Sequence, residues 1–455
     1  MSVSSLNFSA KGAVAACRGL PVGALAMLAV WLTVQTTGAS AGPPTGLHPL
    51  HIQLTDTPQQ SPPTTADCLV FGFHCYQPFQ LEKAYNLKPL RDAGIDGRGR
   101  TIVIVDAFGS PTIEHDLKVF DQQFGLPDPP SFTIIQPAGP VPAFDPNNSD
   151  MVGWGVETSL DVEWAHVIAP GANILLVETP VSETEGVQGF PEIVRAENYV
   201  IDHDLGDVIS QSFGATEETF PSNRSIFDLR SAFKNAAEHK VTVLAGSGDE
   251  GATNWEFNLI DIYPMRVNSW PSSDPLVTSV GGTQLVLDDS GNRLQPDIGW
   301  SGSGGGVSAV FHRPEFQDRV REIVGRRRGT PDISMSAACD GAVNVYLSFI
   351  PQAEGYYLIC GTSEATPEFA GIVALADQAA GRRLGWLGPT LYELGRRAFV
   401  DVTQGDNSFG PYTNSDGTTF SVTGYQAGPG YDLVTGLGTV DAAKLVRALV
   451  EGSED

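Results

Sequence analysis

Short apolar β-type runs alternate with helix-period patterns along most of this chain. Strands separated by helices favour a parallel sheet, because each connection between parallel strands must cross over the sheet. We therefore predict an α/β fold with a mostly parallel sheet flanked by helices on both faces, in one domain over residues 76–450. The predicted strands cover 101–107, 172–179, 207–214 and 241–248, and the predicted helices cover 112–124, 155–168, 189–204, 224–239 and 363–380.

One serine stands between a glycine turn and the start of a helical pattern. The segment reads Cys360-Gly-Thr-Ser-Glu-Ala-Thr-Pro367 and leads into an apolar run. Glycine permits a sharp turn, and a helix N-terminus favours developing negative charge on a hydroxyl. Ser363 is therefore a candidate nucleophile. The alternative is that Thr362 or Ser363 only caps the helix.

A serine nucleophile needs a base, and none of the eight histidines stands in a pattern typical of a catalytic or zinc-binding histidine. Carboxyl groups provide another candidate base. Glu157 and Asp161 are four residues apart in the helical pattern 155–168 and share one face of it. Beside a serine, such a pair can share a proton and act as a base. A solvated acidic face is the alternative.

A third carboxyl group follows an apolar β-type run. The run starting at Val241 ends in the glycine-rich turn Gly246-Ser-Gly-Asp-Glu-Gly251. Active sites of open α/β sheets lie at such strand ends, so Asp249 is a candidate site residue. The alternative is that Asp249 only caps the turn.

Taken together, these motifs resemble the sedolisin family of serine-carboxyl peptidases, which are relatives of the subtilisins. Other matching segments occur in the same order over almost the whole of 76–445. They include 76–85, 101–112, 120–126, 208–214, 299–308, 331–334 and 428–438. The resemblance implies a subtilisin-like fold and a serine-type peptidase. It further implies a secreted endopeptidase or tripeptidyl-type peptidase that hydrolyses peptide bonds at acidic pH.

The resemblance also implies a role for each matching residue. Ser363 falls on the nucleophile, Glu157 on the general base and Asp161 on the acid that orients the base. Asp249 falls on the aspartate of the oxyanion hole, where it must stay protonated, since only a neutral carboxyl group donates a hydrogen bond. Because carboxyl groups replace imidazole in all these roles, we expect activity in acid.

Two segments near the C-terminus resemble the calcium site of the same family. The resemblance implies that one Ca²⁺ binds the side chains of Asp401 and Asp432 together with the carbonyl oxygens of Val402, Gly428 and Gly430. Calcium prefers such hard oxygen ligands, and glycines allow backbone carbonyls to converge beside two carboxylates. A plain glycine turn is the alternative.

The composition is strongly acidic, with 53 acidic residues against 27 basic ones and a formal charge of −26. This charge argues against nucleic acid as a partner. It is consistent with tolerance of acid, where much of the negative charge is neutralised. We expect peptide or protein substrates as partners and a monomeric protein.

The N-terminus predicts a secretory signal peptide at 1–41. Lys11 and Arg18 precede the apolar stretch 20–34, and Ala39-Ser-Ala41 provides small residues for cleavage. We therefore expect a secreted, extracellular protein without membrane attachment after cleavage. An uncleaved N-terminal anchor is the alternative. Residues 42–75 form a short Pro/Thr-rich segment, which we expect to be extended and poorly ordered over 42–67.

Cleavage of the signal peptide would remove Cys17 and leave four cysteines, which suggests two disulfides in an exported chain. Three pairings exist. We favour Cys68–Cys75, which closes a small loop, with Cys339–Cys360, which braces the turn before Ser363. Free buried cysteines are the alternative.

Two features depart from the family pattern. Sedolisins usually carry a large N-terminal prodomain that assists folding, and residues 42–75 leave no room for one. Folding is therefore either unassisted or helped by a separate chaperone-like propeptide, which is a candidate partner. The segment Ser334-Met-Ser-Ala-Ala-Cys-Asp340 also differs from the usual sequence and lies close to the nucleophile. Two other functions therefore stay open. One is a histidine-dependent subtilisin-like hydrolase that uses Asp106, and the other is an inactive secreted peptide-binding protein.

Overall fold

The computed structural model describes residues 51–55 and 57–452. The predicted signal peptide at 1–41 lies outside these residues. Within them, none of the helices combines the length and the apolar character that a membrane span requires.

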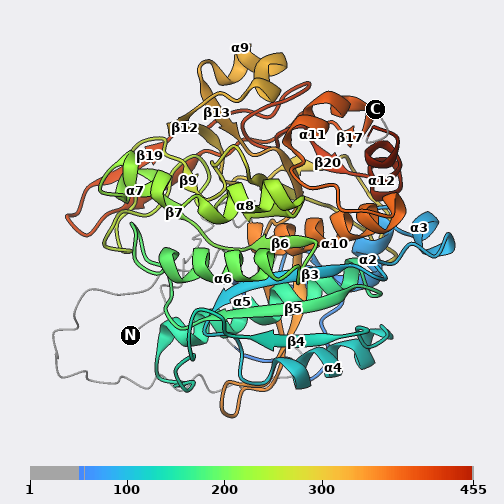
Figure 1. Cartoon of the computed structure of the whole chain (residues 1–455). Helices are drawn as coiled ribbons and strands as arrows, with labels where there is room; N and C mark the ends of the chain where they lie inside the picture. The colour runs from blue at the N-terminus through green and yellow to red at the C-terminus, as the bar shows by residue number, and fades with distance from the viewer. Residues whose placement is uncertain (1–50, 56, 453–455) are drawn as a thin grey trace, which may run out of the picture. The chain divides into compact units, whose positions relative to one another are not determined.

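The centre of the described domain is an eight-stranded sheet, in the order β11-β10-β8-β6-β3-β5-β4 with β14 also paired to β10 (Figure 1). All of its pairings are parallel except β10 with β11. The α/β prediction is therefore confirmed. The strands are β3 (Thr101–Ala107), β4 (Phe132–Ile135), β5 (Asn173–Thr179), β6 (Val208–Gln211), β8 (Thr242–Gly246), β10 (Thr278–Gln284), β11 (Ile298–Gly299) and β14 (Ile333–Ser336).

The helices between these strands follow the predicted pattern with two differences. Helix α5 begins at Ser149, before the predicted start at residue 155, because Asn148 caps it by accepting from the backbone N–H groups of Asp150 and Met151. The single helix predicted at 224–239 is two helices, and at the break Arg230 donates to Asp274. The helices are α4 (Ile113–Phe124), α5 (Ser149–Ile168), α6 (Phe190–Asp202), α7 (Asn223–Asp228), α8 (Ser231–His239) and α10 (Thr362–Ala380).

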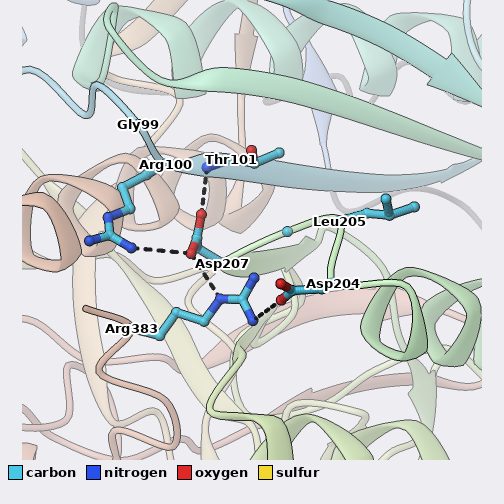
Figure 2. A pocket seen from close by; sticks show the side chains of 8 residues that line it. Gly99, Arg100, Thr101, Asp204, Leu205, Asp207 and Arg383 are labelled. Carbon is cyan, nitrogen blue, oxygen red and sulfur yellow. Dashed lines mark hydrogen bonds and ion pairs between the residues drawn. The ribbon is translucent and has the colours of Figure 1, made fainter. Parts of the chain in front are cut away.

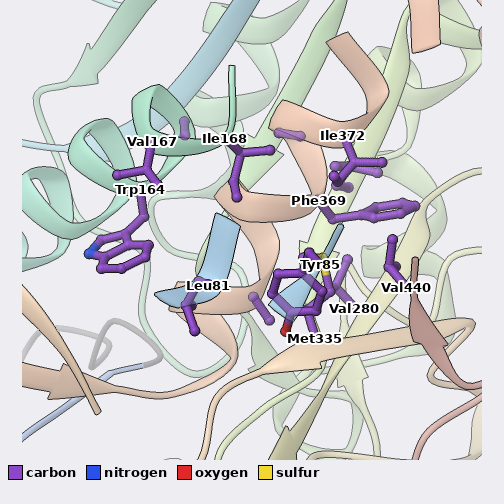
Figure 3. Packing of buried hydrophobic residues seen from close by; sticks show 14 of the residues in the cluster. Leu81, Tyr85, Trp164, Val167, Ile168, Val280, Met335, Phe369, Ile372 and Val440 are labelled. Atoms are coloured by element: carbon purple, nitrogen blue, oxygen red, sulfur yellow. The ribbon is translucent and has the colours of Figure 1, made fainter. Parts of the chain in front are cut away.

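The two faces of the sheet are covered by different helix pairs, and each face has its own apolar core. Along β3, Ile102 and Ile104 belong to the core with α5 and α10, while Val103 and Val105 belong to the core with α6 and α8. Side chains alternate between faces along a strand, so a strand buried on both sides is apolar throughout. Figure 3 shows part of the first core, where Phe369 and Ile372 of α10 lie among residues of α5 and the sheet. These cores hold α5 and α10 against the sheet.

A second, four-stranded sheet lies beside the start of α10, in the order β1-β16-β15-β2. Its strands are β1 (Ile52–Gln53), β2 (Cys75–Tyr76), β15 (Ala342–Leu347) and β16 (Gly355–Cys360). The sequence predicts poor order before residue 67, whereas the structure pairs β1 with the edge of β16, because the N–H and C=O groups of that edge are free to bond it. Both favoured disulfides are present, Cys68–Cys75 and Cys339–Cys360.

The remaining elements complete the described domain, and several of them add buried side chains to the two apolar cores, among them Leu81, Trp270 and Val440. They are α1 (Thr65–Leu69), α2 (Pro78–Ala84), α3 (Lys88–Asp92), β7 (Ala215–Thr216), β9 (Ser269–Trp270), β12 (Gly306–His312), α9 (Arg321–Val324), β13 (Arg327–Thr330), α11 (Gly388–Leu394), β17 (Phe399–Val400), β18 (Phe409–Thr413), β19 (Thr419–Val422), β20 (Thr439–Val440) and α12 (Ala442–Glu451), with 3₁₀ turns at Glu217–Thr219, Glu315–Val320 and Gly395–Arg397.

Candidate active site

Ser363 is the second residue of α10, directly after a turn that only glycine adopts easily. Gly361 caps the helix with a φ of +133°, a value at which other residues are strained. Neither Thr362 nor Ser363 is the cap, so the capping alternative is wrong. The Ser363 hydroxyl is fully buried and donates weakly to the carbonyl oxygen of Ser212, at 3.5 Å. Ser212 follows β6, which places Ser363 at the carboxyl end of the sheet.

Glu157 and Asp161 lie on the buried face of α5, and neither side chain is exposed. The alternative of a solvated acidic face is therefore wrong. Asp161 accepts from the hydroxyl of Ser212 at 2.9 Å, which is the same residue whose carbonyl oxygen meets Ser363. Burial, followed by the charges of Asp106 and Glu157, raises the pKa of Asp161 well above its usual range. Ser212 thus connects the candidate nucleophile with the acidic pair.

Asp106, at the carboxyl end of β3, is a third carboxyl group near this pair. It is fully buried, and neither of its oxygens has a hydrogen-bond partner among the described residues. Burial and the charge of Glu157 raise its pKa well above the usual range. The sequence pointed to Asp106 only through the histidine-dependent alternative. In the structure Asp106 interacts electrostatically with Glu157 and Asp161.

One histidine reaches the site, and the sequence did not single it out. Nδ1 of His51, just before β1, contacts Oε2 of Glu157, while Oε1 of Glu157 has no partner within the described part of the chain. The imidazole therefore meets the candidate base and not the candidate nucleophile. No local motif could have indicated this contact, because it joins residues 106 positions apart.

Asp249 lies in the turn after β8 and points to the start of α10. Its Oδ1 accepts from the backbone N–H of Thr362 at 2.7 Å and from the Thr362 hydroxyl at 2.9 Å. It therefore bonds the nucleophile's helix and does not cap its own turn. Because Oδ1 is an acceptor in both bonds, a proton on Asp249 resides on Oδ2, which is buried and has no partner among residues 51–55 and 57–452. Burial, and then the charge of Glu250, raise its pKa well above the usual range.

The predicted calcium ligands lie in the segments 401–402 and 428–432, which follow the candidate catalytic residues in the chain. The backbone N–H of Gly430 donates to Asp401 at 2.9 Å, and that of Gly428 donates to Asp432 at 3.0 Å. Arg396 also pairs with Asp401. No group of three or more His, Cys, Asp or Glu side chains suited to a metal occurs within the described residues. A calcium ion here would depend on the carboxylates of Asp401 and Asp432 and on backbone carbonyl oxygens, including the carbonyl oxygen of Val402.

The segment 334–340, which departs from the family pattern, is fixed at its end by Asp340. This carboxylate accepts from the backbone N–H of His74 at 2.6 Å and from the side chain of Gln284 at 2.7 Å, and it pairs with the His74 imidazole. Cys339 in the same segment is joined to Cys360, three residues before Ser363. The departing segment thus braces the turn that carries the candidate nucleophile.

A buried serine at a helix start, carboxyl groups on the facing helix and a parallel sheet define a subtilisin-like α/β protein. The model of the Subtilase family matches residues 143–392. A solved structure of Pseudomonas sedolisin, a serine-carboxyl proteinase complexed with pseudo-iodotyrostatin, has a TM-score of 0.68 and 25% identity, and the match covers 84% of this chain and 99% of that one. The chain therefore belongs to the subtilase family and, within it, to the sedolisins.

Curated relatives agree with this assignment. Kumamolisin of Bacillus sp. (strain MN-32) is 31% identical over 388 residues, which cover 82% of this chain and 64% of kumamolisin. Tripeptidyl-peptidase 1 of Canis lupus familiaris is 29% identical over 313 residues, which cover 65% of this chain and 52% of that protein. The chain thus spans between about half and two thirds of the length of these relatives.

Proposed function

We propose that this protein is a serine-carboxyl peptidase that hydrolyses peptide bonds in acid through an acyl-enzyme. The observation that supports the proposal is that Ser363, Asp161 and Asp249 are linked through shared partners at the carboxyl end of one sheet, with Glu157 four residues before Asp161 on α5. Ser212 connects the first two, and Thr362 connects Ser363 with Asp249. Family membership supports the same reaction class.

In the first half of the proposed reaction, Ser363 Oγ attacks the carbonyl carbon of the substrate, and its proton passes to Glu157. Oε1 of Glu157 is the oxygen available for this proton, since Oε2 contacts His51. Collapse of the tetrahedral intermediate breaks the C–N bond, and Glu157 returns the proton to the leaving amine. Water then attacks the Ser363 ester with Glu157 again as base, which releases the acid and restores the enzyme.

Asp249 is the proposed donor to the negative oxygen of the tetrahedral intermediate. Its Oδ1 is held by Thr362, so the proton on Oδ2 is the one free to donate. A protonated carboxyl group can serve this role where burial keeps it neutral. The raised pKa of Asp249 supports this assignment. Asp161 shares a helix face with Glu157 and orients it.

We further propose that one Ca²⁺ binds near Asp401 and Asp432, with the carbonyl oxygens of Val402, Gly428 and Gly430. Both carboxylates are tied to the same glycine segment by backbone N–H groups, and Asp432 also accepts from the backbone N–H groups of Val434 and Thr435. Hard oxygen donors of this kind fit calcium. When bound, the ion would neutralise the two carboxylates and stabilise the folded C-terminal segment.

Secretion, by way of the signal peptide predicted at 1–41, is part of the proposal, as is a separate propeptide that assists folding. The peptide products distinguish an endopeptidase from an enzyme that releases tripeptides. An inactive peptide-binding protein on the same scaffold is the competing function.

The direct test is incubation of the protein with a diverse peptide mixture at acidic and neutral pH, with products identified by mass spectrometry. We expect cleavage in acid by the wild type and none by the Ser363→Ala variant. Internal cuts indicate an endopeptidase, and loss of three residues at a time indicates a tripeptidyl peptidase. Peptide binding without any products would instead favour the inactive protein.

A further inference from the structure

We infer that Glu250 is a positioning residue that holds the proton on Asp249 and thereby sets the upper pH limit of hydrolysis. The inference rests on the proposed function, because it concerns the proposed oxyanion donor. Glu250 follows Asp249 directly in the turn after β8, and the reaction as written above does not use it.

The Glu250 carboxylate is fixed at both oxygens. Oε1 accepts from the indole N–H of Trp255 at 2.8 Å, and Oε2 accepts from the backbone N–H of Asp249 at 3.2 Å. Both donors favour the charged form of Glu250. With each oxygen held, the carboxylate cannot rotate away from its neighbour. Its charge is therefore kept beside the Asp249 side chain.

Other acidic groups interact with these two carboxyl groups. Glu157 of α5 acts on Asp249, while the charge of Glu250 acts on Glu185 and on the phenol of Tyr412 in β18. Thr362 is the donor that opposes protonation of Asp249. Neither Asp249 nor Glu250 forms an ion pair with Lys, Arg or His in the parts of the chain that the structure describes.

These contacts give the pair an ordered response to pH. Burial raises the pKa of Glu250 to about 7, although Trp255 and the Asp249 N–H lower it. As the pH rises from acid, Glu250 ionises, and its charge then opposes a second negative charge on Asp249. In acid both groups are neutral, so Glu250 should matter little there. Its effect is confined to the alkaline limb of the pH profile.

The test compares Glu250→Gln with the wild type by the pH dependence of kcat/KM and by a carboxyl ¹³C NMR titration. The Asp249 signal is assigned as the one lost in Asp249→Asn. We expect Glu250→Gln to move both the alkaline limb and the Asp249 midpoint to lower pH by roughly one unit, since one neighbouring charge is removed. Activity on the acid side should change less than about threefold.

Two further variants make the comparison specific. Glu256→Gln removes a carboxylate from the same loop without a recorded contact to Asp249, so it should leave the limb in place. Trp255→Phe removes the indole donor and should give a smaller shift in the same direction, which is informative if Glu250→Gln does not fold. A shift as large in Glu256→Gln as in Glu250→Gln would overturn the inference.

The two readouts separate this inference from the proposed function. If the wild type hydrolyses peptides but neither the limb nor the Asp249 midpoint moves, the role of Glu250 is refuted and the peptidase stands. If no peptide is hydrolysed but the midpoint falls in Glu250→Gln, the coupling stands and the proposed function fails.

Discussion

The two ends of the central sheet use carboxyl groups in opposite ways. At the carboxyl ends of the strands, Asp106, Asp161 and Asp249 are buried without a cation in contact, as far as the described residues extend, and the pKa of each is raised. At the amino ends, Asp204 and Asp207 are paired with arginines.

Figure 2 shows the amino-end network, in a hollow of about 410 Å³ beside the first residue of β3. Nε of Arg383 lies 2.8 Å from Asp207, Nη1 of Arg383 lies 2.5 Å from Asp204, and Arg100 also pairs with Asp207. The backbone N–H of Thr101 donates to Asp207 as well. Since these charges neutralise one another, this hollow is not a candidate for the catalytic site despite its size.

Pairing with a cation, and not burial alone, decides what a carboxyl group can do. A carboxylate paired with arginine stays charged and contributes structure. A buried carboxyl group without a cation takes up a proton readily and can donate, accept or share it. Variants at the two ends of the sheet should therefore differ in what they change, activity at one end and stability at the other.

The largest effect should come from the carboxyl-end residues that handle the proton. Ser363→Ala and Glu157→Gln should each lower kcat/KM by about 10³-fold or more, because one removes the nucleophile and the other its base. Asp161→Asn should also be severely impaired. Circular dichroism checks that the variants fold. Turnover near the wild-type level in either of the first two variants would refute the mechanism.

Removal of calcium should have the next largest effect, and it should act on stability. A ligand that binds only the folded state stabilises it by about 3–4 kcal/mol at 100–1,000 times its dissociation constant. We expect the melting temperature to rise with added calcium and to fall with a chelator, and Asp432→Ala should abolish this response. A melting temperature indifferent to calcium and chelator would remove the metal from the account.

A smaller effect should come from two glutamates behind the nucleophile, Glu364 and Glu368. Both are fully buried on α10, none of their oxygens has a partner in the described chain, and burial raises the pKa of each well above its usual range. The folded state thus binds more protons than the unfolded state above the unfolded pKa of about 4.3, so stability falls as the pH rises.

Urea unfolding at about pH 4 and about pH 8 measures this dependence. The wild type should be more stable in acid. Glu368→Gln should recover part of the loss at the higher pH and little at the lower one. Equal stability of the wild type at both pH values would show that the carboxyl groups of Glu364 and Glu368 are hydrogen-bonded or hydrated in the folded protein.

The smallest effect should come from the paired end of the sheet. Arg383→Met breaks two partly exposed ion pairs and should lower the free energy of unfolding by about 1 kcal/mol. Activity and the shape of its pH profile should not change, because the network does not contact the carboxyl end. A shifted pH profile in this variant would mean that the two ends are coupled.

The sequence predicted much of the fold, because its periodic signals are local. Strand β3 has the predicted bounds, and the helix that carries Ser363 starts one residue before its predicted start. The sequence analysis missed the start of α5, because Gly153 and Gly155 interrupt the apolar pattern of the first two turns. The start of the helix is marked instead by its N-cap residue, Asn148. The pairing of β1 with β16 was missed because pairing between segments distant in sequence produces no periodic pattern in the sequence.

The candidate site was only partly predictable for the same reason. Ser363, Glu157, Asp161 and Asp249 each stand in a local motif, so they could be named. Ser212 and Thr362 lie within recognised segments, but their bonds to Asp161 and Asp249 depend on the fold. The contact of His51 with Glu157 had no sequence signal at all.

The central claim is that carboxyl groups, and not imidazole, carry out the hydrolysis. The most direct test is the pH dependence of kcat/KM from about pH 3 to about pH 9, for the wild type and for His51→Gln. The account predicts that both proteins are active in acid, with an acidic limb below the histidine value of about 6.5. It would be contradicted by a maximum at neutral or alkaline pH, with an acidic limb near the histidine value of about 6.5 and loss of activity in His51→Gln.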